Sequence, residues 1–224
     1  MLKNAWAIAV KDITLTAGRG SALVRAALLG ALLIVLFSFS LDGAPSASPA
    51  AAATIFWLAS AFCQTILTTS LFSLEENNKA RIGLLLAPMP VQAVWLGKSI
   101  AALLPLLVIQ AVFLVMSVVF LGQSWEGNVV LALAAIVLVD IGVVSLSALL
   151  GSLARGQTAR ESLCSLVLFP LLIPLFLAGI RILAEVYGAQ SGAGLRWLGV
   201  AAAFDAVYMA ASLLLFPLLY GGDD

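Results

Sequence analysis

Six long apolar runs constrain this chain more than any other feature. Each approaches or exceeds the roughly 20 residues that cross about 30 Å of hydrocarbon. Only 10% of the residues are charged, against about 25% in soluble domains, so the bilayer must be the solvent for this much apolar surface. We predict an all-α membrane protein, a single domain over 1–224, with six transmembrane helices at about 21–41, 50–74, 99–121, 129–154, 162–180 and 197–220.

Residues 1–20 have a different pattern and do not form a span. Apolar side chains recur at steps of three and four, with polar residues between them. This pattern predicts an interfacial amphipathic helix that lies flat on the membrane with Trp6 at the headgroup level; an ordinary flanking helix that only anchors the chain is the alternative. Its apolar side comprises Leu2, Trp6, Val10, Ile13 and Ala17. Lys11 and Asp12 interrupt the run where a signal peptide would continue.

The basic residues indicate the orientation of the spans. Six spans place both termini on one side of the membrane. Only Arg181 and Arg196 fall on the opposite side, and the positive-inside rule therefore predicts that both termini are cytoplasmic. The nine basic residues on the terminal side are Lys3, Lys11, Arg19, Arg25, Lys79, Arg81, Lys98, Arg155 and Arg160.

The segment from Leu71 to Lys98 is the longest polar interruption, and its loop is predicted at 75–98. Within this loop the apolar residues at 82–86 recur at helical spacing, which predicts a short helix. Ala87 to Pro90 would end that helix. A short amphipathic helix between two spans, facing the cytoplasm, suits docking into a groove of a partner protein. We favour this over a solvated connector. The predicted ATPase-docking residues are Glu75, Glu76, Arg81, Leu84 and Leu85.

Gly97-Lys98-Ser99 resembles the end of a phosphate-binding loop. That motif requires a glycine five residues before Gly97, where this chain has Gln92, and it follows a buried strand rather than a proline-containing loop. We therefore expect no nucleotide site here and expect Lys98 to mark the membrane edge. If ATP is used, another chain binds it.

Four residues within the spans are candidates for a functional role or for helix bending. Asp140 is near the middle of the fourth span, where a carboxylate costs about 2.5–3.5 kcal/mol. It is interpreted either as a substrate or proton contact or as an aspartate that pins helix packing. Asp205 is expected to be solvated near the outer face. Pro170 and Pro174 share one face of the fifth span and should bend it, either as part of a moving element or as a static kink.

The composition excludes several classes of function. The chain has no histidine, the commonest metal ligand and general base. Its net charge is zero, so no bulk field attracts nucleic acid. Cys63 and Cys164 lie in or beside apolar runs and are interpreted as packing residues. We therefore predict no catalytic, cofactor-binding or metal site on this chain.

Three stretches resemble the haem exporter protein B (CcmB) family of cytochrome c maturation. They are LLLAPMPVQAVWLGK at 84–98, ALLGSLARG at 148–156 and the twin-proline LVLFPLLIPLFLAG at 166–179. The length and the six-span layout are also similar. At the docking loop this chain reads ENNKARIG, whereas the family usually has an acidic, glycine-containing run.

The resemblance implies an ABC-2 exporter-like permease fold in the bacterial cytoplasmic (inner) membrane. Two copies of the permease would pair with two soluble ATPase subunits, joined by a haem-handling membrane protein and a small single-span protein. ATP hydrolysis by the partner would drive haem export or release of a haem-loaded chaperone. Haem would be the cargo of the complex, with no cofactor on this chain.

Three alternatives to this function stay open on the sequence alone. One is an ABC-2 permease for a drug, lipid or polysaccharide. Another is a secondary transporter that uses Asp140 as its proton site. A membrane-embedded enzyme is the weakest, because no nucleophile and base pair or metal cluster is visible in the sequence.

Overall fold

The described part of the chain is helical. A computed structural model describes residues 1–18, 21–41, 45–77, 83–84, 86–153, 158–189 and 192–221, and no strand occurs within these ranges. The long helices are α1 (Leu2–Gly18), α2 (Ser21–Phe39), α3 (Pro49–Asn77), α5 (Val91–Leu121), α6 (Val129–Leu153), α7 (Thr158–Val186) and α8 (Gly194–Gly221). The predicted all-α class is confirmed.

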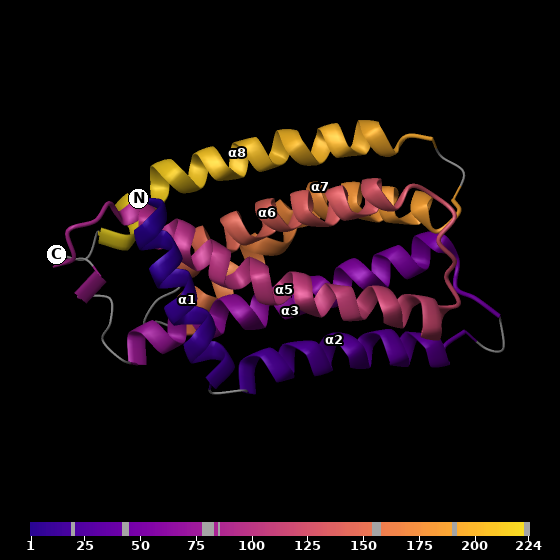
Figure 1. Ribbon diagram of the computed structural model, residues 1–224, viewed down its shortest axis with the longest axis horizontal. Helices are drawn as coiled ribbons and strands as arrows, with labels where there is room; N and C mark the ends of the chain where they lie inside the picture. The colour runs from indigo at the N-terminus through magenta and orange to yellow at the C-terminus, as the bar shows by residue number, and fades with distance from the viewer. Residues whose placement is uncertain are drawn as a thin grey trace.

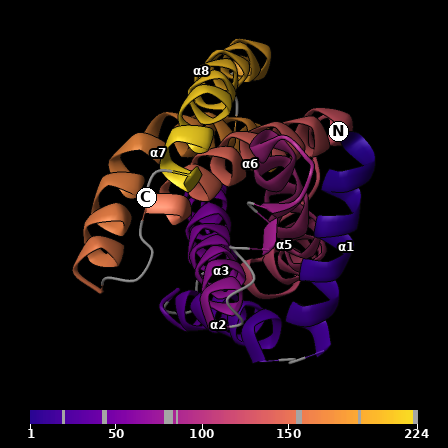
Figure 2. The ribbon, with the colours of Figure 1, turned by 90° about the vertical axis from the view of Figure 1, so that its left-hand side faces the viewer.

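Helices α2, α3, α5, α6, α7 and α8 run along the long axis and alternate in direction (Figure 1). Helix α1 instead crosses one end of this bundle, as the two perpendicular views show (Figures 1 and 2). The same end holds the last turns of α3, the first turns of α5 and the end of α8. The opposite end carries the connection 122–128 and the start of α8.

Within the described residues, five helices are long and apolar enough to cross a bilayer. They contain the stretches Ala22–Phe39, Pro49–Ser73, Val91–Leu121, Val129–Ser152 and Gly194–Tyr220. Helix α7 coincides with the predicted fifth span but is not one of these five, so the count of six spans stays a prediction.

The loop predicted at 75–98 is shorter in the structure, because α3 ends later and α5 begins earlier than predicted. Helix α3 continues to Asn77, and α5 begins at Val91 after Pro90, whose backbone is extended (φ −67°, ψ 139°). Proline is favoured at helix starts because its missing N–H would have no intrahelical partner there. The segment 91–98 is therefore helical, and the connection between the two helices covers 78–90.

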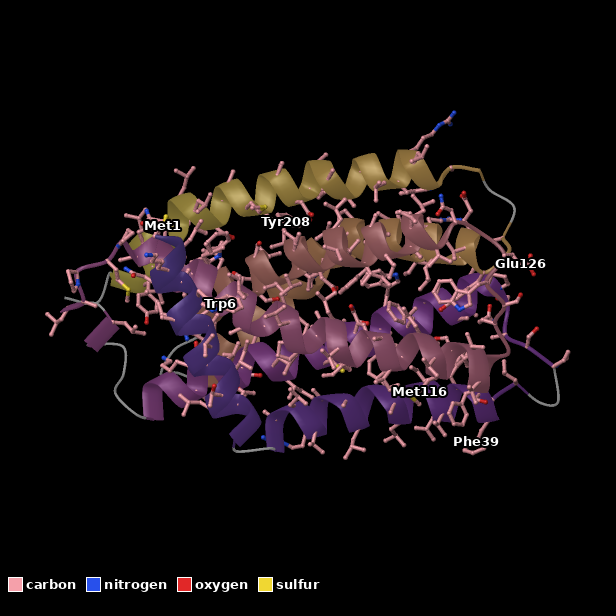
Figure 3. The ribbon with its side chains drawn as sticks, viewed as in Figure 1. Met1, Trp6, Phe39, Met116, Glu126 and Tyr208 are labelled. Carbon is pink, nitrogen blue, oxygen red and sulfur yellow. The ribbon has the colours of Figure 1, made fainter. Side chains whose placement is uncertain are left out.

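One face of helix α1 packs against the protein, and the opposite face is exposed. A face of small and polar residues, including Ala5, Ala9 and Asp12, is buried, chiefly against α5. The apolar residues Leu2 and Trp6 are 75% and 56% exposed, and Figure 3 shows Trp6 on this helix. The apolar side seen in the sequence therefore faces away from the bundle, where lipid can cover it.

Glycines allow several of the helix contacts. A Cβ at Gly179 of α7 would lie 2.5 Å from Cε2 of Trp57 on α3, and a Cβ at Gly97 of α5 would lie 2.8 Å from the Ala5 carbonyl oxygen of α1. Small residues at helix interfaces let backbones and large rings approach closely, which is how membrane helices gain packing energy.

Replacing Gly179 with alanine tests this packing. The added methyl group overlaps the buried Trp57 ring, so we expect Gly179→Ala to lower the free energy of unfolding by about 1–3 kcal/mol. Gly199→Ala is the matched control, because nothing lies within 4 Å of its Cβ position. Thermal unfolding midpoints of the purified protein in detergent measure both. Equal midpoints for the two variants would contradict the account.

Candidate functional site

A buried polar cluster lies between α5, α6 and α8. The side-chain amide of Gln110 on α5 donates from Nε2 to Oδ1 of Asp140 on α6, at 3.0 Å. Both side chains are 1% exposed, and Asp205 on α8 is 4% exposed. Asp205 lies beside Gly142, two residues after Asp140 on α6, so it is close to this cluster. The sequence expectation that Asp205 is solvated is wrong.

The position of Asp205 follows from the pattern of α8 and from a glycine on α6. Asp205 belongs to a buried stripe whose members recur at steps of three and four, so it faces inward. Oδ1 of Asp205 occupies the space that a side chain at Gly142 would fill. The stripe comprises Ala201, Asp205, Tyr208, Ser212, Phe216 and Tyr220.

Several oxygens of this cluster have no hydrogen-bond partner among the described residues. They are Oδ2 of Asp140, both carboxyl oxygens of Asp205 and Oε1 of Gln110. Unsatisfied polar atoms are costly in hydrocarbon, and ionisable residues inside membranes are usually functional. The structure thus places Asp140 in the bundle interior, and its role stays a prediction.

The two prolines of the predicted bend lie within α7, which continues as a helix through both. Pro170 is exposed and Pro174 is half-buried. A proline removes a backbone hydrogen bond and loosens the turn before it. The hydroxyl of Tyr208 on α8 donates to the carbonyl of Leu171, one turn before Pro174. Helix α8 thereby contacts both the polar cluster and the proline region.

A second polar contact joins α1, α5 and α3 near the end of the bundle. Nζ of Lys98 lies 3.6 Å from Oδ2 of Asp12 and 4.7 Å from the ring centre of Phe72. Lys98 is 1% exposed. The sequence suggested that Lys98 marks an exposed membrane edge, and its burial shows that it does not.

Gly97-Lys98-Ser99 lies inside α5 and packs against α1, which is not the loop geometry that cradles phosphate.

The described members of the predicted docking set, Glu75, Glu76 and Leu84, lie at this same end of the bundle (Figure 1). Glu75 and Glu76 fall in the last turn of α3, and their side chains are outside the described part, as are Arg81 and Leu85 altogether. Leu84 is half-buried against the core. The neighbouring Leu86 is 80% exposed, so an apolar side chain projects from this connection. The docking role stays a prediction.

The described residues contain no group of three or more His, Cys, Asp or Glu side chains that could hold a metal ion. Cys63 is buried, and its thiol donates to the Ala26 carbonyl oxygen at 2.9 Å. The notable chemistry of the described part is therefore buried acid, amide and ammonium groups within a helical bundle.

These features define a multi-pass helical membrane protein with polar groups buried between its spans. The sequence profile of the CcmB protein family matches residues 3–218, so the chain belongs to this family. A search of curated proteins found no match. Membership implies the membrane permease subunit of the haem-exporting ABC transporter of cytochrome c maturation, a transport subunit that works with an ATPase.

Sequence reasoning missed two of these contacts. The Asp12–Lys98 pair joins residues far apart in the chain, and Asp12 looked like an interruption of an apolar run, whereas Lys98 looked like a residue at the membrane edge. A signal for Asp205 was present, because the α8 stripe places it between Ala201 and Tyr208 on one helix face.

The Asp12–Lys98 pair is testable by removing the acid. Asp12→Ala removes the buried carboxylate that faces the Lys98 ammonium group, so we expect a loss of about 3 kcal/mol in unfolding free energy. Lys11→Ala is the control, since Lys11 pairs with the same acid at 2.9 Å but is 40% exposed and should change stability little. Chemical denaturation in detergent measures both. Equal losses of unfolding free energy in the two variants would show that the buried Asp12–Lys98 pair contributes no more stability than the exposed Lys11–Asp12 pair.

Proposed function

We propose that this chain is moved by a separate ATPase that docks on residues 71–98, and that the complex exports haem or releases a haem-loaded chaperone. The family match over residues 3–218 is the observation that carries this proposal. ATP is bound and hydrolysed by the partner, and haem is cargo rather than a cofactor of this chain.

The packing of α5 offers a route for mechanical coupling. The connection at 78–90 leads directly into Val91, the first residue of α5. About two turns further along, Gly97 contacts α1 and Lys98 pairs with Asp12 of α1. A force on the connection therefore reaches α1 and α5 together, because the two helices share a close backbone contact and a buried ion pair.

The charges of the described residues support a cytoplasmic location for this end. Lys3, Lys11 and Arg25 lie on or beside α1, whereas Arg181 and Arg196 lie toward the other end of the bundle. By the positive-inside rule, the α1 end and both termini face the cytoplasm. The membrane is then the bacterial cytoplasmic (inner) membrane.

Family membership also supports the remaining partners of this proposal. A second copy of this chain would complete the permease, and a haem-handling membrane protein and a small single-span protein would join it. Apolar side chains that project from the bundle, such as Val108, Val119 and Leu214, leave ample surface for lipid or these subunits.

The docking surface is tested by the triple variant Glu75→Ala, Glu76→Ala and Arg81→Ala. Removing three charges from the contact should cut recovery of the ATPase with the tagged permease at least tenfold and should lower holocytochrome c in the host strain. Glu126→Ala is the control, because this exposed acid lies at the opposite end (Figure 3). Undiminished ATPase recovery with the triple variant would exclude the named residues as the docking site. Normal holocytochrome c in a deletion strain would indicate another cargo.

A further inference from the structure

We propose that helix α1 binds the headgroups of anionic phospholipids, and that Lys3 and Lys11 contact their phosphate groups. The apolar residues Leu2, Trp6 and Val10 enter the boundary between the headgroups and the acyl chains. Such a site is more specific than the flat orientation expected of an amphipathic helix, because it has a defined class of ligand and defined residues that select it. It is independent of the cargo and of where an ATPase docks.

The depth of α1 in the bundle matches the surface of a bilayer. Helix α1 crosses α5 at Gly97 and Lys98. Leu121, the last residue of α5, is 23 residues after Lys98, which is about 35 Å at 1.5 Å per residue. The apolar stretch Ala22–Phe39 of α2, which also runs from the α1 end to the other end (Figure 1), is 18 residues or about 27 Å long. Both lengths are close to the roughly 30 Å of hydrocarbon in a bilayer, so α1 lies at one of its two surfaces.

The surface of α1 divides into three stripes that run along the helix. Successive residues are about 100° apart around the axis, because a turn has 3.6 residues. This spacing places an apolar stripe directly beside the buried face and a polar stripe beyond it. A headgroup layer covers adjacent apolar and polar stripes, with hydrocarbon on one side and water on the other. The buried face comprises Ala5, Ile8, Ala9, Asp12 and Thr16, the apolar stripe Leu2, Trp6, Val10 and Ile13, and the polar stripe Lys3, Asn4, Lys11 and Thr14, with Ala7 and Leu15 beside them.

Contacts with α5 determine how α1 is rotated about its own axis. A Cβ at Gly97 would lie 2.8 Å from both the Ala5 carbonyl oxygen and Cβ of Ile8, so the two helices touch closely there. Oδ2 of Asp12 faces Nζ of Lys98 at 3.6 Å. Ala5 and Asp12 are about 10 Å apart along α1, and two attachments at this separation hold the helix against rotation. The apolar and polar stripes therefore have a set orientation before lipid binds.

The polar stripe presents positive charge to its surroundings. Lys3 is exposed, and the side chain of Lys11 is 40% exposed at 2.9 Å from Asp12. Asp12 is the one acidic residue in the sequence of α1, and it is buried where it also faces Lys98. Ammonium groups at the surface complement lipid phosphate groups, and each basic residue beside an anionic membrane raises the affinity roughly fivefold.

The apolar stripe favours lipid over a protein as the occupant. Leu2 and Trp6 are 75% and 56% exposed. Tryptophan is enriched at the level of the headgroups, where its ring contacts hydrocarbon and its N–H group contacts polar atoms. Trp6 lies on α1 at the end of the bundle (Figure 3), which is the level at which the lengths of α2 and α5 place the bilayer surface.

Native mass spectrometry of the full-length protein in detergent tests the class of lipid. With phosphatidylglycerol and phosphatidylcholine at equal concentrations, we expect the wild type to retain more phosphatidylglycerol, by about fivefold or more. Lys3→Gln with Lys11→Gln should remove most of this preference, and Lys3→Arg with Lys11→Arg should keep it, because charge selects the lipid. Equal retention of the two lipids by the wild type would overturn the proposal.

The matched control is Arg181→Gln with Arg196→Gln. It removes the same total charge from exposed positions toward the other end of the bundle, and we expect it to leave the preference largely unchanged. A preference that falls as much in this control as in the lysine variant would show general attraction to the protein's charge and would overturn the site on α1. Unfolding midpoints within a few degrees of the wild type confirm that the variants fold.

Fluorescence quenching in nanodiscs tests the depth of α1 by a separate readout. The chain has five tryptophans, so the contribution of Trp6 is the difference between the wild type and Trp6→Phe. We expect this difference to be quenched more by bromine near the headgroup end of the acyl chains than by bromine at their far end. A Trp6 contribution that neither lipid quenches would contradict the proposal.

A protein that covers α1 would give a different result. In that case Lys3→Gln with Lys11→Gln would lower recovery of the ATPase and leave phosphatidylglycerol retention unchanged, which would overturn lipid as the ligand. Loss of ATPase recovery in the triple variant of Glu75, Glu76 and Arg81 should instead leave lipid retention as in the wild type. Failure of the docking proposal and failure of the lipid site are thereby distinguishable.

Discussion

The absence of water in the bilayer core is the constraint on which this structure depends. A polar group inside the bundle must be satisfied by another part of the protein. Three contacts between helices meet this requirement: Lys98 with Asp12, Gln110 with Asp140, and Tyr208 with the Leu171 carbonyl. They connect α5 to α1, α5 to α6 and α8 to α7, so polar contacts add to apolar packing at these three helix pairs.

These contacts give the α1 end and the interior of the bundle different properties. At the α1 end, Lys98 and Gly97 attach α5 to α1 directly after the connection on which the proposed ATPase acts. Deeper in the bundle, Asp140 and Asp205 retain oxygens without partners among the described residues. Both places hold buried polar atoms without a hydrogen-bond partner among the described residues, and at the first an ion pair joins two helices.

Much of the fold could be predicted from the sequence, because length and hydropathy determine where helices can cross a membrane. The start of α6 at Val129 and the start of α2 at Ser21 coincide with the predicted boundaries. The start of α5 did not, because Lys98 looked like a residue at the membrane edge. An ion pair with Asp12 lets that lysine lie inside the protein, and pairing between distant residues is not visible in a hydropathy pattern.

The candidate sites were also predictable only in part from the sequence. The burial of Asp140 followed from the cost of a charge at mid-membrane, but its association with Asp205 requires the third dimension. The docking connection was recognisable from its polarity, whereas its partner surface depends on another chain.

The central claim is that the α1 end of the bundle, with the connection at 78–90, faces the cytoplasm. Single cysteines at the exposed positions Pro88 and Ser124, in a chain whose Cys63 and Cys164 are replaced by serine, measure this most directly. A membrane-impermeant thiol reagent applied to intact spheroplasts should label Ser124→Cys and reach Pro88→Cys only after the membrane is broken. Labelling of Pro88→Cys in intact spheroplasts would contradict the account.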